Sequence, residues 1–404
     1  MAEARVLVTA DVHIDGGLDD KRRNSETGRP RAWDSTYEIW LAICRRAIED
    51  KVDAVVVPGD LFRNSWPSAE AVEMIRDGLA LLEQAGLPVV LGNGNHELIS
   101  LPHKYRSPIE HFADMKNVTI ARRTPELVVL GSGLQIVCFP WPKRQMLLEK
   151  WEYEYLTPEE SDDLTGIRMA ELIEEVSAQV DTARGPALLT GHATVSTATL
   201  QSGRRGSERS LADVSHEPVI AMSALDDGPW QRILLGHVHM GQDAGKRGAY
   251  VGAPDRIDRG DEGRSTSFVI SHIPDDGSPG WDEKVPTASR RFATIRVPSG
   301  FDAAEIERLL PERPEELIAT FDLPPGSDAA FETEIRRAAE RFSMAFDINN
   351  PPRPRVERER IVVSEDVNPS EGLAVWLDQQ GGFDEGQRAR LLSKTGELLE
   401  AVLG

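Results

Sequence analysis

The sequence predicts an α/β sandwich, followed by a small α+β unit and a helical tail. Over the first two-thirds of its 404 residues, short runs rich in β-branched residues alternate with longer segments of helical periodicity, which is typical of a layered α/β fold. A turn-rich stretch at 274–280, Pro-Asp-Asp-Gly-Ser-Pro-Gly, marks a change of pattern. We therefore expect domains at residues 1–280, 281–367 and 368–404.

The first domain is expected to contain ten strands and three helices. The strands are short apolar runs at 5–10, 54–57, 88–91, 118–121, 127–130, 134–139, 187–190, 232–235, 249–251 and 267–272. Helical periodicity predicts helices at 36–50, 69–84 and 159–182. The third helix is preceded by Thr157-Pro-Glu-Glu, which is a helix-capping sequence.

The second domain alternates strands and helices over a shorter length. Its expected elements are a strand at 292–297, a helix at 303–310, a strand at 316–321, a helix at 329–346 and, after a Pro-rich linker, a strand at 360–363. The tail is expected to form two helical pieces separated at Gly381-Gly382.

Composition narrows the class of protein. No run approaches the roughly 20 apolar residues that a membrane span needs, and the N-terminus leads directly into a strand pattern without the features of a secretory signal. We expect a cytoplasmic protein that is not in a membrane. Cys44 and Cys138 lie in apolar stretches, which predicts buried thiols rather than a disulfide.

The formal net charge of −21 bears on the substrate. A protein that holds DNA over a long surface by itself is usually basic. Either the substrate is not a long polyanion, or contact with it is local and is helped by metal ions or by a partner.

Five short polar motifs each follow an apolar strand. They are Asp11-Val-His13, Gly59-Asp60, Gly94-Asn95-His96-Glu97, Gly191-His192 and Gly236-His237-Val-His239. Side chains at the carboxyl ends of strands in an α/β sheet converge on one crevice. Each motif alone is more often a core histidine or a simple turn, but five of the nine histidines fall within this set. Together they supply two complete coordination shells.

The residue types in these motifs suit a pair of divalent cations. Asp and Asn supply hard oxygens, His supplies a borderline nitrogen and no Cys takes part, so Mn²⁺ or Fe²⁺ is favoured, Zn²⁺ also fits and Ca²⁺ is disfavoured. A carboxylate such as Asp60 can bridge two ions about 4 Å apart. Such a pair polarises a phosphoryl oxygen and generates hydroxide, which predicts a two-metal phosphoesterase.

The order of the five motifs resembles that of the calcineurin-like metallophosphoesterase superfamily. Within it, the segment Tyr250-Val-Gly-Ala-Pro-Asp-Arg256 resembles the Tyr-x-Gly-Ser-x-x-Arg signature of the SbcD family, nuclease subunits that pair with the ABC-type ATPase SbcC. The resemblance implies a metallophosphoesterase sandwich with a capping domain that binds DNA. It also implies a Mn²⁺-dependent DNA exonuclease and endonuclease, working as a homodimer in double-strand-break processing, repair, recombination and replication.

The resemblance also implies roles for individual residues. One metal would be held by Asp11, His13, Asp60 and His239. The other would be held by Asp60, Asn95, His192 and His237. His96 would face the scissile phosphate and assist the leaving 3′ oxygen, and Glu97 would hold its ring.

Arginines are the candidate substrate-binding residues. Arg63 stands where several SbcD members carry a histidine; a guanidinium does not release its proton at neutral pH, but it can bind a phosphate. Two irregular Arg-rich loops follow ligand motifs and carry Arg22, Arg23, Arg204 and Arg205. Phosphate contact by these loops and a simple solvated surface are both consistent with the sequence.

Two further interpretations stay open. A small-molecule phosphoesterase, such as a cyclic-nucleotide phosphodiesterase or nucleotidase, would fit the acidic charge. An inactive scaffold would require missing ligands, and none is missing. In the tail, apolar stripes at helical spacing include Leu373, Trp376 and Leu377, then Leu391, Leu392, Leu398, Leu399, Val402 and Leu403. These helices either fold back on the small domain or, as the resemblance implies, bind the ATPase at its coiled coil.

Overall fold

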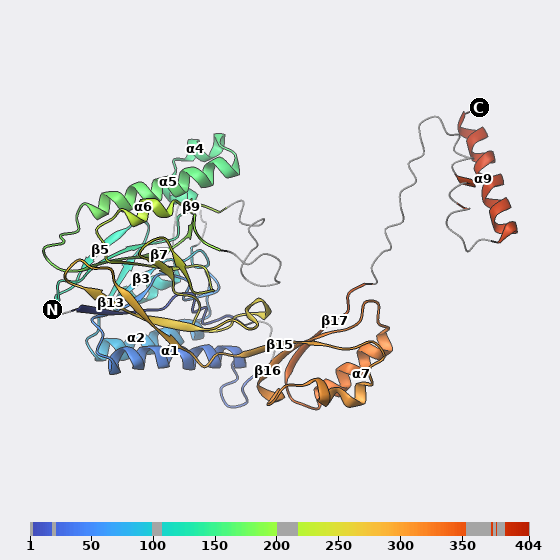
Figure 1. Cartoon of the computed structure of the whole chain (residues 1–404), viewed down its shortest axis with the longest axis horizontal. Helices are drawn as coiled ribbons and strands as arrows, with labels where there is room; N and C mark the ends of the chain where they lie inside the picture. Colours follow the sequence, from blue (N-terminus) through green and yellow to red (C-terminus); the bar gives the residue numbers. More distant parts are fainter. Residues whose placement is uncertain are drawn as a thin grey trace. The chain divides into compact units, whose positions relative to one another are not determined.

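The computed structural model describes residues 3–17, 22–98, 107–199, 217–352, 373–374, 377 and 384–403. Residues Met1–Pro351 form one compact unit, and Pro352–Gly404 form a second. Figure 1 shows the sheets and helices of the first unit, coloured from blue to orange along the chain. In the described part of the chain, no helix is both long and apolar enough to cross a membrane.

The first large sheet has six strands in the order β14-β13-β1-β2-β3-β4. Strands β1 to β4 are mutually parallel, and β13 and β14 extend the sheet with antiparallel pairing. Their bounds are Glu3–Val8 for β1, Ala54–Val57 for β2, Val89–Gly92 for β3, Val118–Ala121 for β4, Ser267–Pro274 for β13 and Trp281–Pro286 for β14.

The second large sheet has the order β11-β12-β10-β7-β6-β5. Its central strands β6, β7, β10 and β12 are parallel. The bounds are Glu126–Val129 for β5, Gln135–Phe139 for β6, Ala187–His192 for β7, Arg232–Gly236 for β10, Gln242–Ala244 for β11 and Gly248–Tyr250 for β12. A short pair, β8 (Thr194–Val195) and β9 (Val219–Ile220), lies beyond β7.

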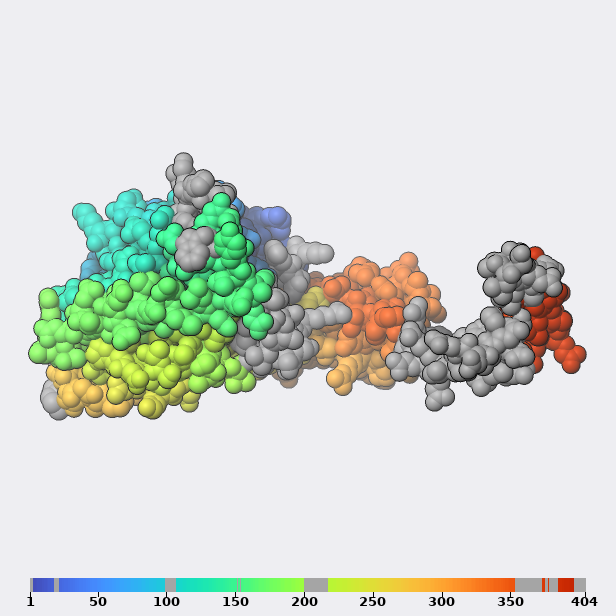
Figure 2. Space-filling view, turned by 90° about the horizontal axis from the view of Figure 1, so that it is seen from above, coloured from blue at the N-terminus to red at the C-terminus, as the bar shows by residue number. Residues whose placement is uncertain are grey.

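The two sheets pack face to face, and helices cover their outer faces. Along β1, Val6 and Val8 are buried between the sheets, whereas Leu7 is buried against α1 (Arg31–Glu49) and α2 (Ala69–Gln84). The second sheet is covered by α5 (Pro158–Ser177) and α6 (Met222–Asp226). Figure 2 shows the green α5 beside the yellow-green segment that includes α6. The structure confirms the predicted α/β sandwich.

Short helices complete this part of the chain. They are α3 (Arg144–Leu147), α4 (Lys150–Tyr155) and the 3-10 turns η1 (Pro108–Phe112) and η2 (Arg259–Asp261). The predicted capping sequence is present at α5, where the Thr157 hydroxyl accepts the backbone N–H of Glu160. Cys44 and Cys138 are buried free thiols, as predicted.

A separate small parallel sheet follows the sandwich. It consists of β15 (Arg291–Arg296), β16 (Leu317–Asp322) and β17 (Ala345–Asn349), with β16 in the centre. One face packs on the 3-10 helix η3 (Ala303–Leu309) and on α7 (Ala329–Glu340) through its own apolar cluster. A second 3-10 turn, η4 (Pro314–Glu316), precedes β16.

Several elements of the first unit differ from the sequence predictions. The helix predicted at 303–310 is the 3-10 helix η3. The predicted helix at 329–346 ends at Glu340, and its last residues form a turn through Ser343, whose φ is 53°, and then strand β17. The helix predicted at 159–182 ends at Ser177. Strand β14 was not predicted, and it carries the first large sheet to Pro286, beyond the expected domain boundary at 280. The predicted strand at 360–363 lies outside the described residues.

The second unit contains helix α9 (Glu385–Leu403). This is the helix predicted after the Gly381-Gly382 break. The Arg388 guanidinium donates to the carbonyl oxygen of Leu377 at 2.7 Å, and the Leu377 side chain is buried. This contact joins α9 to the helical residues before Gly381.

Substitution of Gly78 tests how closely α2 packs against α1. A Cβ at this position would lie 2.1 Å from Nε1 of the buried Trp40. Alanine would add about 1 kcal/mol of intrinsic helix stability, but overpacking costs about 1–3 kcal/mol. We expect Gly78→Ala to lower the free energy of unfolding by about 1 kcal/mol in urea denaturation. The exposed Glu73 in the same helix provides the control. Glu73→Ala should change the free energy of unfolding by less than about 0.5 kcal/mol. A more stable Gly78→Ala protein would contradict the packing.

Candidate metal centre

The carboxyl ends of strands from both large sheets meet at one place. The adjacent parallel strands β1, β2 and β3 lead into the first three motifs, and the adjacent strands β7 and β10 carry the last two. The seven predicted metal ligands at these strand ends are Asp11, His13, Asp60, Asn95, His192, His237 and His239.

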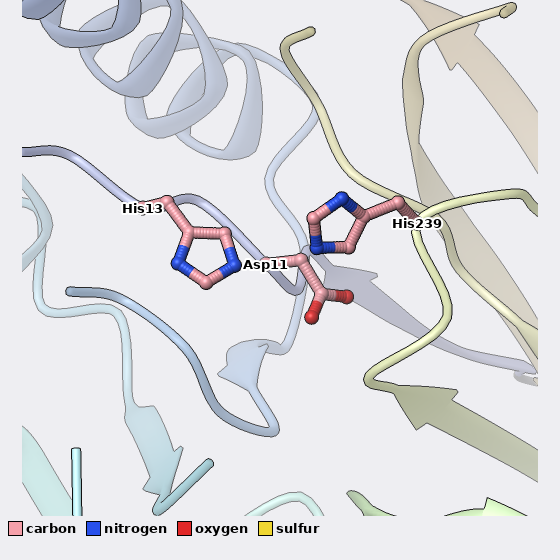
Figure 3. A group of neighbouring side chains, drawn as sticks. All are labelled: Asp11, His13 and His239. Atoms are coloured by element: carbon pink, nitrogen blue, oxygen red, sulfur yellow. The ribbon is translucent and has the colours of Figure 1, made fainter. Parts of the chain in front are cut away.

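One group of ligand atoms comes from the first and last motifs. A carboxylate oxygen of Asp11 and ring nitrogens of His13 and His239 all lie within 4.8 Å of one another, and the three residues are buried. Figure 3 shows the two imidazoles on either side of the Asp11 carboxylate. Residues more than 220 positions apart in the sequence thus supply one set of ligands of the kind that divalent cations use.

Asp60 lies between this group and a second one. Its Oδ2 atom is 3.6 Å from Nε2 of His13 and 3.4 Å from Nε2 of His192. Asp11, Asp60 and His192 form another buried group of ligand atoms within 4.8 Å. Asp60 therefore lies beside ligand atoms of both groups, as the predicted bridging ligand would.

Asn95 completes the second group. Its Oδ1 atom lies 3.0 Å from Nε2 of His192 and 3.2 Å from Nδ1 of His237. The structure therefore brings all seven predicted ligands together. The allocation of individual ligands to one ion or the other stays a prediction.

The backbone of these motifs is unusual. In the described part of the chain, seven non-glycine residues have a positive φ, and four of them belong to the motifs: Asp11 at 55°, His13 at 44°, Asp60 at 56° and His237 at 97°. This left-handed region is costly for residues with a Cβ and is concentrated at functional sites. Backbone bonds from Asp11 N to Gly59 O and from His13 N to Asp60 O hold the first two loops together.

The fit of these side chains to cations is clearest at His13. Its ring is buried, and within the described residues neither ring nitrogen makes a hydrogen bond. Burial lowers the pKa of His13 to about 3, although the charge of Asp60 acts in the opposite direction. Burial likewise lowers the pKa of His192 and of His239. These imidazoles are therefore neutral at physiological pH, which is the form that binds a metal.

Glu97 has a different position from the one expected. Its carboxylate does not hold the ring of His96 but accepts four backbone N–H groups, from Asp60, Leu61, Phe62 and Gly94, at 2.7–3.2 Å. Burial and then the charge of Asp60 raise the pKa of Glu97, whereas the backbone N–H donors lower it and favour the charged carboxylate. Glu97 therefore joins the loops after β2 and β3.

The ring of His96 is held by a backbone group instead. Its Nδ1 lies 3.0 Å from the carbonyl oxygen of Arg63, and because a carbonyl only accepts, Nδ1 carries the hydrogen. The ring is half-buried and lies edge-on to His13, with ring centroids 4.9 Å apart. Nε2 is thus the ring nitrogen that does not take part in this hydrogen bond.

The predicted arginines differ in what they contact. The charge of the Arg63 guanidinium lowers the pKa of the neighbouring His13, although burial has the larger effect. Arg63 therefore lies close enough to interact electrostatically with a proposed ligand. Arg22 instead donates to the carbonyl oxygens of Glu315 and Ser343, at 2.8 and 2.9 Å, which ties its loop to the small-sheet region. Arg23 donates to the carbonyl oxygen of Gly28 within its own loop. Arg204 and Arg205 lie outside the described residues.

The Tyr250–Arg256 segment fixes the surroundings of the centre. The Tyr250 hydroxyl donates to Ala193 O and accepts Val195 N–H, directly after His192. Arg256 donates to the carbonyl oxygens of Arg264 and Arg290. The two signature residues therefore support loops next to the ligands.

Two residues at the centre were missed by sequence analysis. Trp141 lies just beyond β6, and its ring centroid is 4.6 Å from that of His237. Glu217 Oε2 lies 3.3 Å from Nε2 of the same histidine. The position of Trp141 after a strand next to β7 was a usable signal. For Glu217 no signal was available, because it belongs to none of the motifs.

This arrangement defines a metal-dependent phosphoesterase: buried Asp and His clusters from both sheets suit a dimetal site. The half-buried His96 also forms such a group of ligand atoms, together with His13 and Asp60. Residues 4–241, more than half of the chain, match the calcineurin-like phosphoesterase family, and the chain belongs to that family.

Curated relatives include a nuclease subunit and a DNA repair protein. Over 259 residues the chain is 24% identical to SbcD, a component of the nuclease SbcCD of Escherichia coli K12, covering 62% of this chain and 60% of that protein. Over 94 residues it is 30% identical to the DNA double-strand break repair protein Mre11 of Methanopyrus kandleri, covering 23% and 19% of the two chains. The matches thus span at most about 60% of these relatives.

Solved structures with a similar fold include two phosphatases. A dimetal phosphatase from Danio rerio has a TM-score of 0.43 and 11% identity, covering 70% of this chain and 98% of that one. The purple acid phosphatase PPD1 from yellow lupin, Lupinus luteus, has a TM-score of 0.42 and 13% identity, covering 70% and 52%.

Glu97→Gln tests whether the Glu97 carboxylate holds the loops after β2 and β3 together. In either orientation, the glutamine amide would turn its NH₂ group toward backbone N–H groups that now donate to an oxygen. An unsatisfied buried donor costs about 1–3 kcal/mol. We expect the free energy of unfolding to fall by that amount in denaturant titrations of the metal-free protein. Glu49→Gln, at an exposed position, removes the same charge and serves as the control. An equal loss of unfolding free energy in the two variants would contradict the role of Glu97 in holding the loops together.

Proposed function

We propose that this chain is a DNA nuclease that hydrolyses phosphodiester bonds with two divalent cations, Mn²⁺ being favoured. The observation that carries the proposal is the dimetal-type centre with His96 beside it, in a chain similar to a nuclease component over 62% of its length. The small parallel sheet after the sandwich is consistent with a capping domain that contributes to DNA binding.

The cations would be held by the two ligand groups, with Asp60 shared between them. When bound, they supply an activated hydroxide and stabilise charge on the phosphoryl oxygens. In its imidazolium form, His96 would give the proton on Nε2 to the leaving 3′ oxygen and become neutral imidazole, while Nδ1 keeps its hydrogen and its bond to Arg63 O. We expect the Arg63 guanidinium to bind a phosphate oxygen and not to act as a proton donor.

A small-molecule phosphoesterase is the second candidate. The net charge of −21 favours it, because a small substrate needs no long basic surface. Purified protein with Mn²⁺ should be assayed on a linear DNA duplex and on a cyclic nucleotide in parallel. Cleavage of the duplex supports the nuclease, and turnover of the cyclic nucleotide alone overturns it.

His96→Gln separates chemistry from metal binding. We expect this variant to bind two Mn²⁺ ions and DNA as the wild type does, because its ring is not among the seven proposed ligands. Its turnover on DNA should fall about 10²–10⁴-fold, the usual contribution of a general acid. Metal content is measured by elemental analysis and turnover under saturating DNA. Loss of a metal ion in this variant would show that His96 is a ligand, and wild-type turnover would remove its role as a proton donor.

The second unit is proposed to bind an SbcC-type ATPase through α9 and the helical residues before it. The unit is compact by itself, and Leu391 in α9 is 41% exposed. A chain ending at Pro351 should therefore keep its fold, both metals and cleavage of short DNA, but should no longer co-elute with an ABC-type ATPase carrying a coiled coil. Full-length protein is the control. Retained co-elution would contradict the binding role, and unfolding would show that the tail packs on the rest of the chain.

A further inference from the structure

His237 is surrounded by contacts that orient it. Its backbone N–H donates to both oxygens of Asp11, each at 3.1 Å, and its φ is 97°. Nδ1 faces Asn95 Oδ1 at 3.2 Å, within the second ligand group. The other ring nitrogen, Nε2, therefore points away from that group.

A carboxylate lies at this second nitrogen. Glu217 Oε2 is 3.3 Å from Nε2, and the side chains of Glu217 and His237 are only 16% and 14% exposed. A histidine that binds a metal through one nitrogen commonly donates its other N–H to a carboxylate, which sets the tautomer and the orientation of the ring. With the hydrogen on Nε2, the lone pair of Nδ1 is directed at the ligand group.

The indole of Trp141 packs on the same imidazole. The ring centroids are 4.6 Å apart with an angle of 44° between the planes, and Trp141 is 8% exposed. The indole also lies edge-on to His192, at 6.0 Å. Trp141 is held in place by its backbone N–H, which donates to Asn93 O at 2.8 Å, and it lies between two prolines. Rotation of the His237 ring is therefore blocked on this side.

We infer that Glu217 and Trp141 are positioning residues that fix His237 for the second of the two cations. The inference rests on the proposed two-metal function. Without Glu217, the ring of His237 loses the carboxylate that sets its tautomer and its orientation. The other group of ligand atoms, from Asp11, His13 and His239, does not use the His237 ring, so the first cation should be bound as before.

The test is Mn²⁺ binding by the full-length, metal-free protein, measured by calorimetry and by electron paramagnetic resonance. We expect Glu217→Gln and Glu217→Ala to weaken one of two binding events about 10–100-fold, the usual effect of removing such a partner. The resonance signal of coupled Mn²⁺ pairs should disappear at concentrations where the wild type shows it. Trp141→Ala should also weaken one of the two Mn²⁺ binding events. Trp141→Phe keeps an aromatic ring and should still form coupled Mn²⁺ pairs.

The exposed Glu307→Gln makes the same change of charge away from the centre and should leave both binding events unchanged. Two unaltered binding events in Glu217→Gln, or equal weakening of both, would overturn the inference. Because Gln matches Glu in size, a failure of Glu217→Ala to fold leaves the test intact. DNA cleavage is not the readout: a wild type that binds two Mn²⁺ ions without cutting DNA overturns the nuclease, whereas one that binds a single ion overturns the assignment of His237.

Discussion

The centre depends on one buried carboxylate. Glu97 accepts four backbone N–H groups, three from the loop after β2 and one from the loop after β3, and these loops carry Asp60 and Asn95. The loops leave adjacent parallel strands, so nothing in the sheet itself sets their spacing beyond the strand ends. The Gly94 backbone approaches Asp60 so closely that a Cβ there would lie 2.0 Å from Oδ1. The carboxylate and the glycine therefore both contribute to the close approach of the two loops, together with the bond from His96 N–H to Asp60 Oδ1 at 3.1 Å.

Much of the sandwich and the ligand set could be predicted because both depend on local patterns. Short apolar runs identified every central strand of the two sheets, and helical spacing identified α1, α2 and α5. The seven proposed ligands were recognisable because each lies at or shortly after the end of a strand, and parallel strands bring their carboxyl ends to one edge. In these segments the local sequence pattern is therefore enough to predict which side chains meet in the folded protein.

The features that were not predicted depend on contacts between distant residues. Strand β14 contains Asp282, Glu283 and Lys284, so it lacks an apolar run, and its pairing with β13 makes it a strand. The end of α7 is set by the turn at Ser343, which places the residues after it in the small sheet. Glu97 was expected to hold the ring of its neighbour in sequence, whereas three of its bonds go to residues 35 to 37 positions earlier. Sequence proximity was a poor guide wherever a backbone group was the partner.

The left-handed backbone at four of the ligands has a consequence for evolution. Each such residue costs about 1–3 kcal/mol relative to a relaxed conformation, in a protein whose total stability is only about 5–15 kcal/mol. Glycine at Asp11, His13, Asp60 or His237 would relieve that cost and would also remove a ligand. Stability of the fold and the proposed binding of cations therefore make opposite demands on the same four residues.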